Sequence, residues 1–189
     1  MEMKIGPLQK IKAAWGGASR FRFLLITITL MLAFYAALYH PYAEGSVPGR
    51  LLGAYLKLAA NGSALLLGWL GEDVNVQGTS VMGRFPFIVV LDCAALDAQA
   101  LFAAAVLAFP VSLRAKLLGL SSGLFAIWLI NVIRLVVLYF AGAHSIRLFE
   151  ILHEEVLVLV VIVSVCLLFV AWAFWAMKKA PGAQAAVAA

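Results

Sequence analysis

The chain has 189 residues, of which 65% are hydrophobic and 12% are charged. This composition is too apolar for a soluble domain and is typical of an integral membrane protein. The formal net charge of +5 comes from short basic clusters beside apolar runs. Such clusters fix the orientation of a membrane protein, so they do not indicate nucleic-acid binding. The length suits one membrane-embedded domain, which we expect at 23–177.

Residues 1–22 are basic and precede an apolar stretch at 23–39, which predicts a first membrane helix. A cleaved signal peptide would have the same basic start and apolar core. The basic N-terminal segment is long, and no clear signal-peptide cleavage site of the small-x-small type precedes His40. We therefore expect an uncleaved anchor with a cytoplasmic N-terminus, followed by an exterior segment at 41–48.

The stretch 51–70 allows two interpretations. Its length fits a membrane span, but Lys57 and Asn61 interrupt the middle. If it spans, the later basic clusters at 114–116 and 178–179 lie outside. If it lies on or dips into the outer surface, both clusters lie inside, which the positive-inside rule favours. We expect the surface or re-entrant placement.

Residues 72–91 alternate β-branched and polar side chains around Gln77-Gly78-Thr79, which predicts a short exterior β-hairpin. Asp92 then has the position of an N-cap. A helix is expected from Cys93 to residue 109, where Pro110 would end it. The basic loop at 111–116 would be cytoplasmic.

The apolar run 117–140 predicts the next span. Gly119 and Gly123 form a small-xxx-small pair that permits close helix contact. An exterior loop is expected at 141–150 and a last helix at 151–177. The residues 178–189 would form a disordered cytoplasmic tail. The prediction is an all-α polytopic membrane protein with four spans and both termini inside, plus the surface segment and hairpin.

This topology places Cys93, Arg134 and His153 at one level on the exterior face, each from a different helix. A nucleophile, a cation and a base at one level could perform covalent acyl transfer. Arg134 could stabilise a thiolate or an oxyanion. The expected position of His153 in a first helical turn favours neutral imidazole, which can act as a base. Asn131 shares a helix face with Arg134 and is expected to hold its guanidinium.

Each of these residues also has an ordinary interpretation. A near-end membrane Arg can snorkel to the headgroups, and a lone membrane Cys is most often packing. His144 is a rival base, although we expect it in a loop beside Gly142. Two cysteines do not make a disulfide framework or a zinc site, and Cys166 fits a core or lipid-facing hydrophobe. We expect no metal and no cofactor.

Residues 91–172 resemble the exosortases and archaeosortases, which are integral membrane cysteine transpeptidases. The likeness consists of Leu91-Asp92-Cys93 after a hairpin, Asn131-Val132-Ile133-Arg134 in an apolar helix, and Leu152-His153-Glu154 opening the last helix. The chain departs from the family in having Ala94-Ala95 after the cysteine, where Ser or Asn and then Gly are usual. It also lacks several N-terminal spans, so it would be a short variant.

The resemblance implies that Cys93 is the nucleophile, Arg134 the transition-state stabiliser and His153 the general acid and base. It also implies a substrate class, namely exported proteins with a C-terminal motif, a membrane helix and a basic end. The enzyme would lie in the inner membrane and work at its exterior face. The alternative is a non-catalytic module, such as a small transporter or assembly subunit, in which Arg134 binds an anion. A transporter would place polar residues along a mid-membrane path and often contain a repeat, so the peptidase interpretation is preferred.

Overall fold

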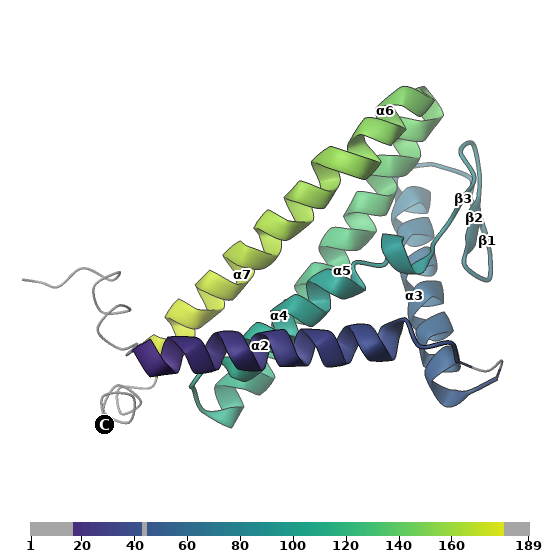
Figure 1. Cartoon of the computed structure of the whole chain (residues 1–189). Coiled ribbons are helices and arrows are strands. Elements are labelled where there is room, and N and C mark those ends of the chain that lie inside the picture. The colour runs from purple at the N-terminus through teal and green to yellow at the C-terminus, as the bar shows by residue number, and fades with distance from the viewer. Residues whose placement is uncertain (1–16, 43–44, 180–189) are drawn as a thin grey trace, which may run out of the picture.

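The computed structural model describes residues 17–42 and 45–179 and is predominantly helical (Figure 1). The helices are α2 (Gly17–Leu38), α3 (Val47–Trp69), α4 (Leu96–Ala108), α5 (Leu113–His144), α6 (Ile146–Ile151) and α7 (Leu157–Lys179). A short 3-10 turn, η1 (Leu91–Cys93), precedes α4, and a π-helical turn, η2 (Leu152–Val156), joins α6 to α7. Of the tail expected at 178–189, residues 178 and 179 belong to α7, and residues 180–189 lie outside the described residues.

Four helical segments in the described part of the chain are long and apolar enough to cross a membrane. They are Phe21–Leu38, Val47–Trp69, Leu113–His144 and Ile146–Lys178. The all-α, polytopic fold class is therefore confirmed. The helix expected at 93–109 is shorter than predicted, because α4 has only 13 residues and extends about 20 Å, so α4 alone does not reach across a hydrocarbon core of about 30 Å.

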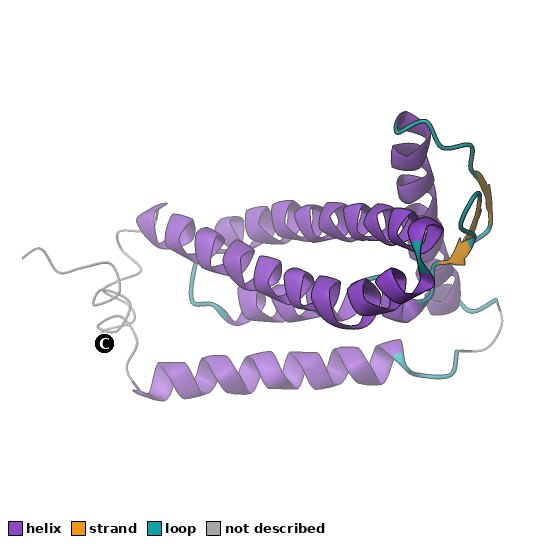
Figure 2. Ribbon diagram, turned by 90° about the horizontal axis from the view of Figure 1, so that it is seen from above, coloured by secondary structure: helices purple, strands orange, loops and turns teal. Residues whose placement is uncertain are grey.

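Helix α3 crosses α5 and α7 steeply instead of running alongside them (Figures 1 and 2). Its N-terminus is fixed by Ser46, whose side chain accepts a hydrogen bond from the Gly49 amide at 3.3 Å. The residues that it buries, Ala59, Ala60, Ser63 and Leu67, lie in its second half. By length and composition α3 qualifies as a span, but its orientation favours a placement along one surface.

Helices α4, α5 and α7 run together as a bundle, and α2 packs against α4 (Figure 2). The predicted glycine pair on α5 is buried and makes close contacts. A Cβ atom on Gly119 would lie 2.2 Å from the Trp172 ring of α7, and one on Gly123 would lie 2.1 Å from the Phe102 ring of α4. The small-xxx-small prediction is confirmed, with aromatic rings occupying the space that the glycines leave.

The predicted hairpin is present and gains a third strand. Strands β1 (Asn75–Gln77), β2 (Ser80–Met82) and β3 (Phe87–Ile88) form an antiparallel sheet in the order β1-β2-β3. Gln77 pairs with Ser80, so the turn has two residues. Gly78, the first of them, has φ +66°, a value that suits glycine at this position of a tight hairpin turn.

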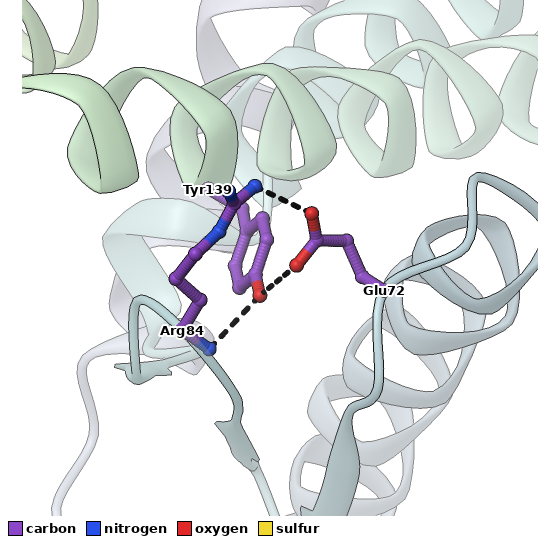
Figure 3. A network of polar contacts seen from close by, with 3 residues as sticks. All are labelled: Glu72, Arg84 and Tyr139. Atoms are coloured by element: carbon purple, nitrogen blue, oxygen red, sulfur yellow. Dashed lines mark hydrogen bonds and ion pairs between the residues drawn. The ribbon is translucent and has the colours of Figure 1, made fainter.

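Three polar groups tie the sheet region to α5 (Figure 3). The hydroxyl of Tyr139, which is fully buried, donates to the Glu72 carboxylate at 2.8 Å and accepts from the Arg84 amide at 3.0 Å. The Arg84 guanidinium forms an ion pair with the same carboxylate. Residues on both sides of the hairpin are thereby attached to one tyrosine of α5.

The exterior loop expected at 141–150 is wrong. Helix α5 continues through His144, and α6 begins at Ile146, so only Ser145 separates the two helices. Gly142, taken as a loop residue, is helical and buried, and a Cβ atom there would lie 2.4 Å from the Phe85 ring. The glycine is present because an aromatic ring of the β2–β3 connection needs the space.

Candidate active site

Cys93, Arg134 and His153 come from η1, α5 and η2. These segments meet at the end of the bundle where the sheet and α6 lie (Figure 1), which we call the site end. Arg134 lies within electrostatic range of both Cys93 and His153. The folded chain thus brings together the three residues singled out from the sequence, with Arg134 as the group common to both interactions.

Arg134 is buried, with 7% of its surface exposed, and its Nε atom has no hydrogen-bond partner. A snorkelling side chain would lie along the lipid-facing surface of its helix. Instead, almost the whole of Arg134 is covered by protein, and α5 continues for ten residues beyond it to His144. Arg134 is therefore a buried cation with an unused donor, within electrostatic range of a thiol and an imidazole, which the snorkelling interpretation does not explain.

Asn131 is fully buried and donates from Nδ2 to the Cys93 carbonyl oxygen at 3.0 Å. Its Oδ1 atom has no hydrogen-bond partner. The expectation that Asn131 holds the guanidinium of Arg134 is therefore wrong. The amide instead fixes the backbone of the residue that carries the thiol, so it supports the candidate nucleophile.

His153 lies in the π-helical turn η2, in a helical path that runs from Ile146 to Lys179. The expected position at a helix start is therefore wrong, and the helix-dipole argument for a neutral imidazole does not apply. The ring stacks on Phe149 with centroids 5.3 Å apart and planes 9° apart. Phe149 in turn contacts Phe85, with ring centroids 5.2 Å apart. Since π-helical turns are frequent at functional sites, the local distortion suits a residue whose orientation matters.

The imidazole Nδ1 of His153 is buried without a hydrogen-bond partner. No hydrogen bond joins the Cys93 thiol to Arg134 or to His153 in the described part of the chain. Catalytic hydrogen bonds are often long in the absence of substrate and shorten only in the complex. The geometry is therefore compatible with the catalytic roles expected from the sequence.

Asp92 is exposed and lies within η1. Helix α4 begins three residues after Cys93, with Ala95 as its N-cap in the left-handed conformation and no side-chain capping bond. The N-cap role of Asp92 is therefore wrong. The reason is that Cys93 belongs to a separate 3-10 turn, which ends before the helix begins.

The other candidates lie away from this group. Cys166 is exposed on α7, as expected for a lipid-facing hydrophobe. His144 is exposed and occupies the last turn of α5 rather than a loop. In the described residues, no group of three or more His, Cys, Asp and Glu side chains could hold a metal ion.

Two further residues contact the Cys93 loop and were not singled out from the sequence. The hydroxyl of Tyr55, on α3, donates to the Ala94 carbonyl oxygen at 3.1 Å and accepts from Gln99 Nε2 at 2.6 Å. Tyr55 and Ala94 are 39 positions apart in the chain, and no local motif marks such a pair. Only the interruption of 51–70 by polar residues indicated that this segment had a special placement.

No protein-family model matches the chain, and no curated protein or solved structure is significantly similar to it. The functional argument therefore depends on the residues of the site and on their geometry.

Proposed function

We propose that this chain is a membrane-embedded cysteine protease or transpeptidase, similar to the exosortases and archaeosortases. The observation that carries the proposal is the buried Arg134, which lies within electrostatic range of both Cys93 and His153. Buried, unpaired cations are rare in membrane proteins and usually mark functional sites. A thiol and an imidazole beside the same guanidinium are the groups that covalent acyl transfer requires.

The proposed reaction assigns one task to each side chain. His153 accepts the thiol proton of Cys93, and the thiolate sulfur attacks the scissile carbonyl carbon. The carbonyl oxygen becomes an oxyanion, which the Arg134 guanidinium stabilises. The carbon–nitrogen bond then breaks, His153 returns the proton to the leaving amine, and a thioester remains on Cys93. An acceptor amine or water releases the acyl group and restores the thiol.

The proposed substrates are exported proteins with a C-terminal motif, a membrane helix and a basic end. The site end would face the exterior of the inner membrane. This orientation is supported by Arg114 and Lys116, which are at the opposite end of α5, and by Lys178 near the end of α7. Basic residues at that end belong in the cytoplasm by the positive-inside rule.

The test of function is cleavage of a tagged exported protein that carries such a C-terminal signal, co-expressed with each variant. Cys93→Ala should abolish processing at a normal membrane level. Cys93→Ser should be nearly as inactive, because a hydroxyl ionises far less readily than a thiol. Cys166→Ala is the matched control and should process normally. Processing by the Cys93→Ala variant would overturn the proposal.

The test of orientation uses single cysteines in a chain that also carries Cys93→Ala and Cys166→Ala. Arg147 and Arg114 are both exposed, and they lie on α6 and in the first turn of α5. A membrane-impermeant maleimide added to intact cells should label the Arg147→Cys variant and spare the Arg114→Cys variant until the cells are opened. The reverse pattern would contradict the proposed exterior site.

A further inference from the structure

The loop that carries Cys93 has a conformation that its own sequence does not favour. The amide of Cys93 donates to the Val90 carbonyl and the amide of Ala94 to the Leu91 carbonyl, both at 3.0 Å. The next residue, Ala95, has φ +51° and is the only non-glycine residue with positive φ in the described part of the chain. A left-handed alanine is strained, so the surrounding structure must hold this turn in place.

Two side chains from different helices hold two consecutive carbonyl groups of the turn. Asn131 Nδ2 of α5 donates to the Cys93 oxygen, and the Tyr55 hydroxyl of α3 donates to the Ala94 oxygen. Gln99 Nε2 donates to the Tyr55 oxygen, so the tyrosine proton is left free to point at Ala94. Together with the amide bonds within the turn, these contacts fix the peptide groups on the C-terminal side of the thiol-bearing residue.

We propose that Tyr55, oriented by Gln99, is a positioning residue that holds the Cys93 thiol beside the Arg134 guanidinium. This inference deepens the proposed function and rests on Cys93 being the nucleophile. It makes α3 part of the active site, although α3 contributes no reacting group. A displacement of about 1 Å can lower turnover on the order of 100-fold, so a contact that fixes the turn matters to catalysis.

The Tyr55 hydroxyl can be removed without detaching α3. The buried residues of this helix, Ala59, Ala60, Ser63 and Leu67, lie further along and belong largely to the core shared with the sheet and α5. Tyr55→Phe keeps the ring and loses only the oxygen. Gln99→Leu keeps Tyr55 and removes the donor that orients its hydroxyl. A matched control is Tyr42→Phe, since the Tyr42 hydroxyl bonds to the exposed Ala37 carbonyl.

The experiment compares how fast Cys93 reacts with iodoacetate, an anion, and with iodoacetamide, its neutral analogue. It uses the full chain in lipid nanodiscs with Cys166→Ala, so that Cys93 is the only thiol. A guanidinium beside the thiol should accelerate the anionic reagent selectively, and Arg134→Gln should remove the preference. The ratio of the two rate constants therefore reports the juxtaposition of Cys93 and Arg134, without any peptide substrate.

Tyr55→Phe and Gln99→Leu should both lower this ratio about 4-fold. That is roughly the loss of attraction when two unit charges separate from about 4 to 5 Å at an effective dielectric constant of about 20. In the processing assay kcat should fall while KM stays near the wild-type value. Tyr42→Phe should leave both readouts unchanged.

A wild-type ratio in both Tyr55→Phe and Gln99→Leu would overturn the positioning role. If one of these variants fails to accumulate, the ratio measured in the other tests the positioning role. If Cys93→Ala still processes substrate while the Tyr55→Phe ratio falls, the proposed function fails and the positioning of the thiol stands. The two failures are thus distinguishable.

Discussion

The two halves of α5 differ in the polar side chains that they bury. In the first half, Ala115, Gly119, Gly123 and Ile127 are buried, and they face a core of apolar and aromatic side chains that includes Phe102 and Trp172. The second half also buries apolar residues, but it buries Asn131, Arg134 and Tyr139 as well. Asn131 bonds to the Cys93 backbone, and Tyr139 bonds to the Glu72 carboxylate and the Arg84 amide.

The two ends of the bundle are therefore specified in different ways. An apolar contact needs only matching shapes, so the first half depends on the room that its small residues leave. A buried polar group must find a partner with the right geometry, so the second half depends on segments far away in the chain. Asn131 and Arg134 each keep a polar atom without a hydrogen-bond partner. The proposed active site is at these two residues.

The largest expected effect is a loss of activity from a substitution in the second half of α5. Arg134→Lys keeps the charge but loses the planar pair of donors, so turnover of a signal-bearing substrate should fall by ~100-fold or more. The membrane level of the variant should match the wild type. Arg147→Lys, on the exposed surface of α6, is the matched control and should be active. Wild-type rates for Arg134→Lys would show that the charge alone suffices.

The second effect is on stability and concerns the first half. Gly123→Ala places a Cβ atom 2.1 Å from the Phe102 ring, and overpacking of this kind costs about 1 to 3 kcal/mol. The unfolding temperature in detergent should drop, while turnover per folded molecule stays unchanged. Gly53→Ala is the control, because a Cβ atom there meets nothing within 4 Å and alanine favours the helix. Equal unfolding temperatures for the two variants would refute the close contact.

The smallest expected effect returns to the second half. Tyr139→Phe removes the hydroxyl that joins α5 to Glu72 and to the Arg84 amide, at a net cost of about 1 kcal/mol. The Glu72–Arg84 ion pair remains, so the sheet should loosen from α5 without unfolding. Faster amide hydrogen exchange confined to 72–90 is the expected signature. Uniform exchange rates would mean that the hydroxyl does not hold the sheet, and Tyr42→Phe provides the comparison.

Three of the long apolar helices, the hairpin and the glycine contacts were predictable from the sequence alone. Long apolar runs predict spans because a bilayer requires about 20 such residues. Helices α2 and α5 match the predicted ranges 23–39 and 117–140 with shifted ends, and the range 151–177 comprises the last residue of α6, the turn η2 and most of α7. The hairpin followed from alternation around Gly78, and close packing at Gly119 and Gly123 followed from their spacing. All of these signals are local, so they can be read within one element.

Sequence and topology also singled out Cys93, Arg134 and His153, but the contacts that position them were decided by the tertiary structure. Asn131 bonds to a carbonyl 38 positions away, Tyr55 to one 39 away, and Tyr139 to a carboxylate 67 away. Helical periodicity carries no information about such partners.

The same reason explains the errors near the site. Glycine is common in loops, which is why Gly142 was expected in one. In the structure Gly142 continues α5, and the Phe85 ring packs against it. Aspartate is a common N-cap residue, which is why Asp92 was expected to cap the helix. In the structure a left-handed Ala95 separates Asp92 from α4, and Tyr55 and Asn131 hold the turn that contains it. At both positions a contact from another segment outweighed the local preference of the residue.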